Sequence, residues 1–157
     1  MPIAIAITTT IALLGTAVIF GADVVAAVVL RPTYAGVDDR TLVQAVGRGH
    51  HFGDRRLPVA GILGVICTVP TAVLTFIAGQ VLPGVLAAIA LLLLLTWLML
   101  FARISKPINA RLSAAALADD VPPDARALQD RWESIINLRA AIQGVAVALL
   151  CAVLFVL

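Results

Sequence analysis

The chain has 157 residues, of which 62% are hydrophobic, and its mean hydropathy is +1.08. A soluble domain is roughly half apolar, so this composition excludes an ordinary soluble domain and indicates one integral membrane domain over residues 1–157. The net charge is only +2, and the arginines are scattered with few aromatic residues between them, which argues against a nucleic-acid partner.

Four apolar segments follow one another along the chain, at about 3–30, 57–78, 83–104 and 135–157. Backbone polar groups inside lipid must be hydrogen-bonded within the chain, so the sequence predicts an all-α fold, an integral membrane four-helix bundle. The first segment is longer than the apolar region of a signal peptide and lacks a basic start, so we expect it to stay as a helix. Pro32 is expected to end this helix, and Pro70 is expected to kink the second one.

All eleven Lys and Arg residues lie in two stretches, 31–56 and 103–139. Basic connections between membrane spans stay in the cytoplasm. The pattern therefore predicts a multi-pass protein of the inner (plasma) membrane, with connections 31–56 and 105–134 cytoplasmic and both termini outside. Basic residues near the bilayer also suit anionic membrane lipid as a partner.

The first connection is predicted to begin with a short surface helix at 38–46, after its acidic start. Gly47, Gly49 and Gly53 are then expected to loosen the chain around His50 and His51. Adjacent histidines on a helix point about 100° apart, so they are poorly placed to bind one ion together. No H-x-x-H spacing is present, and we expect no metal or other cofactor, although haem or metal ligation by His51 (or a metal at His50) stays open.

The second connection is predicted to hold two helical stretches. A short amphipathic helix should run to Ala118. A second helix should start at Asp124, a suitable N-cap residue, and continue through Trp132 into the last span.

Asp23 is the most informative single candidate for a functional residue, because it is the one acid within an apolar span. An unpaired carboxylate there would cost about 2.5 kcal/mol or more. We therefore expect Asp23 to face the bundle and to be protonated or paired, with Arg139 as partner. The pair could be a structural clasp, or Asp23 could accept or donate a proton in a buried site.

The inner end of the bundle is the predicted site. Trp132, Ile136 and Arg139 share a helical face, and Asn109 follows the third span at matching depth. An acid, a base, amide donors, a fixed cation and an aromatic wall would suit a planar, partly anionic molecule arriving from the membrane. The residues predicted to converge are Asp23, His51, Asn109, Trp132, Asn137 and Arg139.

Small residues recur at every fourth position of the last span, which lets another helix approach closely. Packing within the bundle is the favoured interpretation, and homo-oligomerisation is the alternative. The two thiols, Cys67 and Cys151, lie deep in apolar spans, where we expect small packing residues and no redox pair. The small residues are Ala140, Gly144, Ala148 and Ala152.

Several short motifs, in this order, resemble those of the anthrone oxygenase-like membrane proteins, a family long catalogued as a domain of unknown function. The resemblance covers nearly the whole chain, and its most specific elements are P-x-N-x-x-L at 107–112 and W-x-x-x-x-N-x-R at 132–139. The remaining matches are Gly21, Pro32, Gln44, His51 and Gly53.

The resemblance implies a four-helix bundle and, for some members, oxidation of an anthrone to an anthraquinone by molecular oxygen without flavin or haem. On that basis His51 or Asp23 would be the base, Asn109, Asn137 and Arg139 would hold the oxyanion, and Trp132 would wall the pocket. The substrate would be a hydrophobic aromatic small molecule. The alternatives are a non-enzymatic bundle that serves as a partner subunit or scaffold, a small proton-coupled exporter, and a haem or metal variant.

Overall fold

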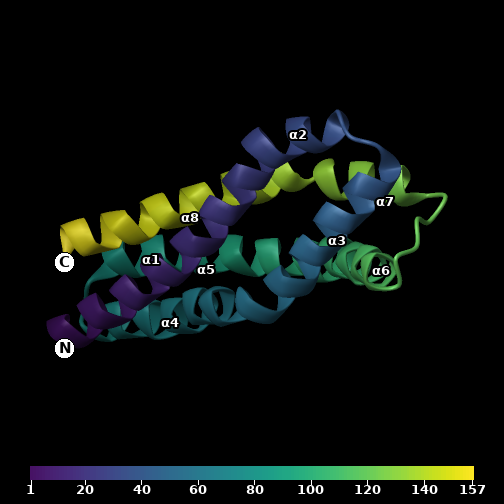
Figure 1. Ribbon diagram of the computed structural model, residues 1–157. Coiled ribbons are helices and arrows are strands. Elements are labelled where there is room, and N and C mark those ends of the chain that lie inside the picture. The colour runs from purple at the N-terminus through teal and green to yellow at the C-terminus, as the bar shows by residue number, and fades with distance from the viewer.

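The computed structural model describes all 157 residues, and every regular element is helical (Figure 1). Four helical stretches are long and apolar enough to cross a membrane, which confirms the predicted all-α fold with four candidate spans. In chain order the elements are α1 (Pro2–Val25), η1 (Ala26–Leu30), α2 (Arg31–Ala35), α3 (Asp39–Arg56), α4 (Pro58–Ile77), α5 (Val81–Leu100), η2 (Phe101–Ser105), α6 (Lys106–Leu117), α7 (Ala125–Glu133) and α8 (Ile136–Val156).

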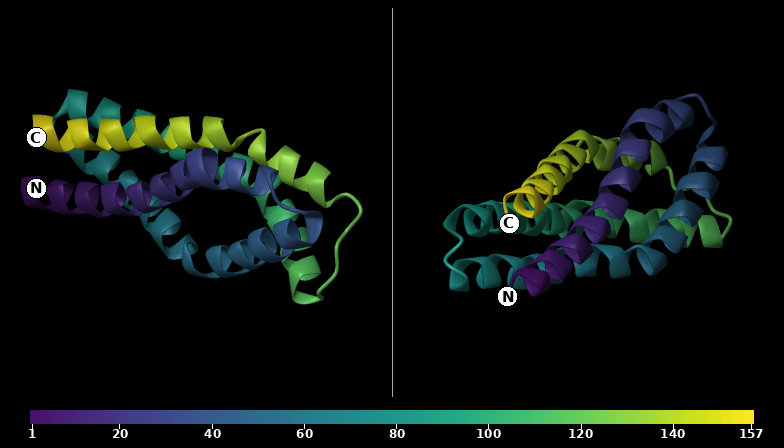
Figure 2. Two further views of the ribbon diagram at one scale, coloured as in Figure 1. Left: turned by 45° about the horizontal axis from the view of Figure 1, so that its top comes forward. Right: turned by 90° about the vertical axis from the view of Figure 1, so that its left-hand side faces the viewer.

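The four spanning helices close into a ring, in which α1 and α5 each pack against both α4 and α8. The two termini lie at one end of this bundle, and α2, α3, α6 and α7 gather at the other end (Figures 1 and 2). Both long connections are therefore on the same side, where α3 packs against α6. Along the axis the core is made of small and aliphatic side chains: Ala12, Ala90, Leu94, Ala146 and Leu150.

Helices α1 and α4 approach closely because glycines face each other. A Cβ atom added to Gly15 would lie 2.5 Å from the carbonyl oxygen of Ala60, and one added to Gly64 would lie 2.8 Å from the Thr16 hydroxyl. The Thr16 hydroxyl itself donates to the carbonyl of Ala12 at 2.8 Å. Small residues and locally satisfied hydroxyls allow close helix contact where water cannot drive association.

A π-helical turn carries the first helix past Pro32, so the prediction that proline ends it is wrong. Proline has no N–H to donate to the carbonyl four residues before it, as an α-helix requires. The wider π turn at Ala26–Leu30 precedes Pro32 and lets the helix continue to Ala35. The same arrangement recurs at Phe101–Ser105, before Pro107, where α5 continues into α6. The second helix keeps Pro70 inside an unbroken α4.

From Asp39 to Arg56 the first connection is one long helix, α3, and not a short helix followed by a loose segment. Asp38 caps α3 by accepting from the backbone N–H of Thr41 at 3.0 Å and from its hydroxyl at 2.5 Å. These bonds, the hydroxyl's first, lower the pKa of Asp38. The helix then runs through Gly47 because that glycine lies directly on α6, where a side chain would overlap the backbone carbonyl of Leu112. The glycine pattern thus serves helix packing, and the predicted loosening is wrong.

Substitution at two glycines of α3 should have opposite effects. Gly47→Ala is expected to lower the free energy of unfolding by about 1–3 kcal/mol, because its Cβ overpacks the α3–α6 contact. Gly49→Ala meets nothing within 4 Å and should raise the free energy by about 0.5–1 kcal/mol, since alanine is the better helix former. Thermal unfolding of both variants in detergent measures the difference, and equal melting temperatures would contradict the packing described here.

The predicted helix from Asp124 into the last span is present as the helical stretch Ala125–Val156, but a turn at Ser134 and Ile135 interrupts it and divides α7 from α8. At this turn the Ser134 hydroxyl donates to the carbonyl of Arg131 at 2.7 Å, and Ile135, the N-cap of α8, has φ −108° and ψ −3°. Asp124 does occupy the N-cap position of α7, but it makes no cap bond. Its carboxylate instead accepts from Arg111 at 3.0 Å.

The small-residue stripe of α8 flanks its buried face. A Cβ atom on Gly144 would lie 3.1 Å from the ring of Phe20, so this part of the stripe packs against α1 inside the bundle. Ala148 is exposed. Both thiols are free; Cys67 is half-buried, whereas Cys151 is exposed, which corrects the expectation that it is a buried packing residue.

Candidate functional site

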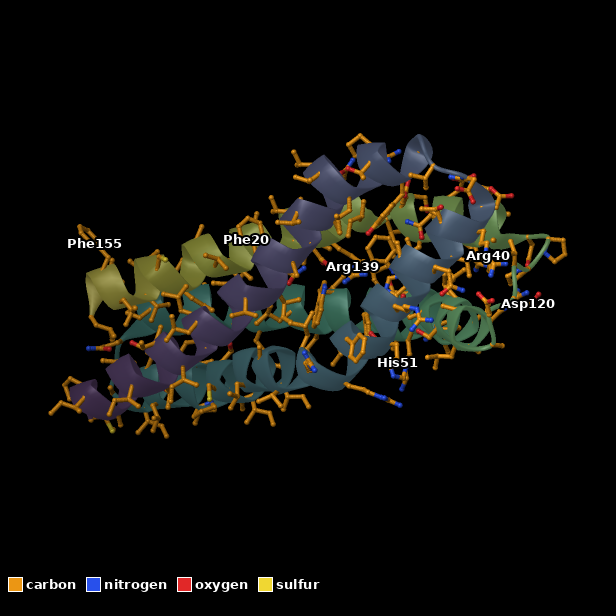
Figure 3. All side chains as sticks on the ribbon, viewed as in Figure 1. Phe20, Arg40, His51, Asp120, Arg139 and Phe155 are labelled. Atoms are coloured by element: carbon orange, nitrogen blue, oxygen red, sulfur yellow. The ribbon has the colours of Figure 1, made fainter.

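A cavity of about 660 Å³ lies where the spanning helices meet α3, α6 and α7. Most of its lining is apolar, and the polar groups gather toward the connecting helices. Charged side chains crowd this end of the molecule, while Phe155 and other apolar side chains project from the spans (Figure 3). Four predicted site residues line the cavity: Asp23, Asn109, Trp132 and Arg139.

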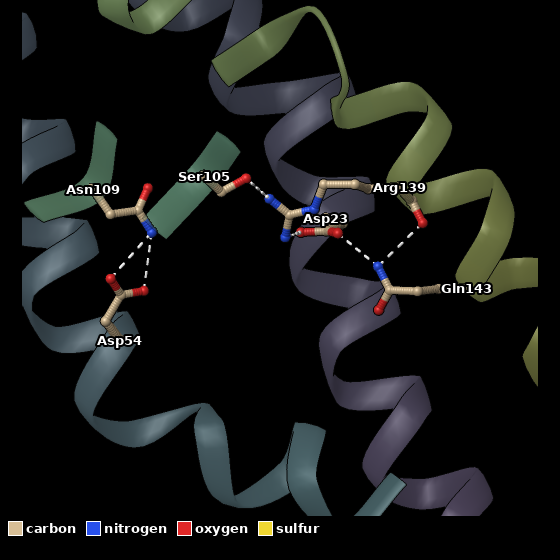
Figure 4. A network of polar contacts seen from close by, with 6 residues as sticks. All are labelled: Asp23, Asp54, Ser105, Asn109, Arg139 and Gln143. Atoms are coloured by element: carbon tan, nitrogen blue, oxygen red, sulfur yellow. Dashed lines mark hydrogen bonds and ion pairs between the residues drawn. The ribbon is translucent and has the colours of Figure 1, made fainter. Parts of the chain in front are cut away.

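Asp23 and Arg139 form a closed, buried ion pair, which confirms the predicted partnership (Figure 4). Arg139 Nη2 donates to one Asp23 oxygen at 2.9 Å, and Gln143 Nε2 donates to the other at 2.6 Å. Arg139 Nη1 donates to the Ser105 hydroxyl at 2.7 Å. The Arg139 side chain is only 5% exposed and the Asp23 side chain only 7%. The network therefore links α1, η2 and α8 and leaves Asp23 little capacity for further bonds.

Aromatic rings surround the guanidinium of Arg139 on the cavity side. Its central carbon lies 6.0 Å from the ring centroid of Trp97, 5.8 Å from that of Phe101 and 5.5 Å from that of Trp132. Cation–π attraction favours such positions, and more so away from water. Arg139 Nε has no hydrogen-bond partner. The site therefore combines a fixed cation with flat apolar walls.

Asp54 and Asn109 form a second polar pair across the cavity from this network (Figure 4). Asn109 Nδ2 donates to both carboxylate oxygens of Asp54, at 3.0 and 3.2 Å. Asp54 is an exposed residue, but the partial desolvation of its carboxylate raises its pKa, and the Asn109 bond and the charges of Arg139 and Lys106 only partly offset this. The carboxylate is thus a stronger base than an ordinary aspartate, and it faces the cavity.

His50 also lines the cavity, with its ring centroid 5.3 Å from that of Trp132. Its Nε2 is buried and has no hydrogen-bond partner. Burial first, and the charge of Arg139 second, lower the pKa of His50 to about 4. At neutral pH the ring is therefore uncharged and free to bond a ligand.

Two predicted site residues lie elsewhere. His51 is outside the cavity lining, with Arg55 Nη1 donating to its Nε2 at 2.6 Å and its ring against Phe52. Asn137 is exposed and also outside the lining. Since α3 is an unbroken helix, neighbours such as His50 and His51 point in different directions, and only the first faces inward. The structure groups no three His, Cys, Asp or Glu side chains that could hold one metal ion.

Two of the three residues that sequence reasoning missed, Asp54 and Gln143, share a helical face with a residue that it had singled out. Asp54 lies four positions after His50, and Gln143 lies four positions after Arg139, so each pair is aligned on one side of its helix. Treating 39–56 as a helix would have placed His50 and Asp54 together. Ser105 carried no such signal, because its place depends on the π turn η2.

His50 should make the protein less stable in mild acid. Its folded pKa, about 4, is below the ordinary 6.5, so the unfolded chain binds the extra proton between these values and the free energy of unfolding falls as pH falls through them. The expected loss is about 3 kcal/mol over this window. Asp54 has the opposite effect on the free energy of unfolding. Its pKa is raised in the folded state, so the folded protein takes up this proton at a higher pH than the unfolded chain does.

Melting temperatures of the wild type and two histidine variants, measured from pH 7 to pH 4, isolate the contribution of His50 to this loss of stability. His50→Gln should show a weaker loss of stability in acid than the wild type, whereas His51→Gln should keep the wild-type dependence. The same pH dependence in all three proteins would show that His50 is not buried uncharged.

No family model matches the sequence, and no curated protein or solved structure matches the chain.

Proposed function

We propose that this protein is a membrane-embedded oxygenase that converts a lipid-soluble, anthrone-like aromatic ketone to a quinone with molecular oxygen, as the motif resemblance implies. The observation that carries the proposal is that one cavity, walled by Trp132, is lined by both the Asp54 carboxylate and the unpartnered His50 ring. A base, a neutral hydrogen-bonding group and a flat wall are what such a substrate requires.

Apart from the protein's own side chains, the proposed reaction needs only the substrate and molecular oxygen. Asp54 takes a proton from the methylene carbon between the two rings, and the carbanion's charge spreads onto the ketone oxygen as an enolate. Oxygen is reduced as it forms a C–O bond with that carbon, giving a hydroperoxide after protonation. Loss of water breaks the O–O bond and leaves a second carbonyl, so one anthrone and one O₂ give one anthraquinone and one H₂O.

The other residues support this step. Arg139 supplies a fixed positive potential for the enolate, although its charge is shared with Asp23. Asn109 holds the Asp54 carboxylate through its bidentate contact. Trp132 orients the rings, because aromatic groups prefer defined stacked or edge-on geometries. Asp54 thus takes the role of base that sequence reasoning gave to His51 or Asp23, and His50 is the neutral hydrogen-bonding group.

We place the protein in the plasma membrane, with connections 31–56 and 105–134 in the cytoplasm and both termini outside. The support is the confinement of every Lys and Arg to those connections and their borders. The cavity then lies at the cytoplasmic boundary of the bilayer, where a substrate dissolved in the membrane could enter it.

A non-enzymatic partner subunit is the competing proposal. It is favoured by the closed Asp23–Arg139 pair, which such a bundle would use to fix helix order. It also requires a filled interior, and a cavity of about 660 Å³ is poorly suited to that role. Ligand pockets for small molecules span about 300–1,000 Å³, so the cavity favours a bound molecule.

The test is oxygen uptake by purified protein supplied with anthrone. We expect one O₂ consumed per anthrone, with anthraquinone as product. 10,10-Dimethylanthrone, which has no hydrogen on the reacting carbon, should be bound but not consumed. An anthrone oxidation rate equal to that of buffer and empty detergent would overturn the proposal.

A further inference from the structure

The cavity reaches the outer surface of the spanning helices. Ile62 and Ile66 on α4 and Leu98 on α5 line it, yet these residues are 54%, 59% and 41% exposed. Exposed apolar groups on a spanning helix face lipid. These three residues therefore form a rim, here called the lateral rim, where the cavity meets the hydrocarbon of the bilayer.

The opposite part of the cavity is polar and better enclosed. Asn109 and Arg139 are 3% and 4% exposed there, and His50 Nε2 and Trp132 Nε1 are buried without partners. Unpaired buried donors and acceptors are costly unless something bonds them. A ligand group with oxygen atoms would satisfy them, and an aliphatic chain would not.

We propose that the ligand of this cavity is an aromatic ketone or quinone that carries a long aliphatic chain. The ring lies against Trp132 with its oxygens toward His50 and Arg139, and the chain leaves over the lateral rim into the bilayer. This inference rests on the proposed function for the aromatic ring system of the ligand, and it adds that the ligand carries a long aliphatic chain. Such a molecule would stay anchored in lipid while its ring is in the cavity.

The tryptophans provide a direct signal. The protein has two tryptophans, Trp97 and Trp132, and both line the cavity. A quinone bound there should quench nearly all tryptophan emission. The probes are 2-methylanthraquinone and 2-dodecylanthraquinone, which share the ring system of the expected product and differ in the chain.

The test variant is the double substitution Ile62→Phe and Ile66→Phe, which narrows the lateral rim. The matched control is Val73→Phe with Ile77→Phe, two exposed positions on the same helix that do not line the cavity. We expect wild type and control to bind both probes with similar Kd. The rim variant should bind the dodecyl probe about tenfold more weakly, as overpacking costs predict, and keep its affinity for the methyl probe. Unchanged binding of the methyl probe also shows that the variant is folded.

The outcomes separate this inference from the proposed function. If the methyl probe binds and the dodecyl probe is excluded by wild type, the chain proposal is wrong and the ring site stands. If the rim variant weakens both probes equally, or neither, the lateral rim is not the path of the chain. If neither probe quenches wild type, the proposed function fails together with the inference.

Discussion

Replacing Arg139 by alanine is expected to lower the free energy of unfolding by about 3–5 kcal/mol, because removing one partner of a buried ion pair strands the other. The stranded group is Asp23, whose remaining contact is the amide of Gln143 at 2.6 Å. The Ser105 hydroxyl would lose its donor as well. Denaturant or thermal unfolding in detergent measures the effect.

Second substitutions show whether the pair itself is responsible. Adding Asp23→Ala to Arg139→Ala should recover part of the loss, since no buried carboxylate then remains. Arg139→Lys should recover little, because lysine lacks the planar fork that contacts Asp23 and Ser105 together. Additive losses in the double variant would contradict a coupled pair.

Replacing Asp54 by asparagine is expected to reduce anthrone turnover by about 10²–10⁴-fold, the usual contribution of a general base. The change keeps size and can keep a hydrogen bond from Asn109, so it removes the proton acceptor with little effect on packing. Oxygen uptake under saturating substrate measures turnover, and tryptophan quenching measures binding. Binding should change much less than turnover.

Asp130→Asn is the matched control. Asp130 is an exposed aspartate on α7 that does not line the cavity, so its loss should leave turnover at the wild-type level. Equal turnover in Asp54→Asn and Asp130→Asn would remove Asp54 from the reaction and return attention to His50.

The fold was largely predictable because lipid restricts the choices. Long apolar segments must be helices, and all four spans were found in this way. Helix ends were harder, since they depend on local geometry. Pro32 does not end the first helix because the π turn η1 precedes it, and no pattern in the sequence marks such a turn. Gly47 is a contact point between α3 and α6, a role that requires knowledge of the partner helix.

The site was predictable where charge required it. Asp23 within an apolar span needed a partner, and Arg139 was the basic residue at a suitable depth. His51 and Asn137 were assigned from their depth and from the motif resemblance, and depth does not say which side of a helix a residue occupies. Once α3 is a continuous helix, the inward positions are His50 and Asp54. The error therefore came from the helix boundary and not from the chemistry expected of the site.

The central claim is that the cavity binds a flat, lipid-soluble aromatic molecule, and the most direct measurement is a titration of the purified protein with anthrone under argon, followed by tryptophan fluorescence. Because Trp97 and Trp132 both line the cavity, we predict strong and saturable quenching that reports a single Kd. A weak decrease that stays linear with anthrone concentration would mean that the molecule only dissolves in the detergent, and would contradict the claim.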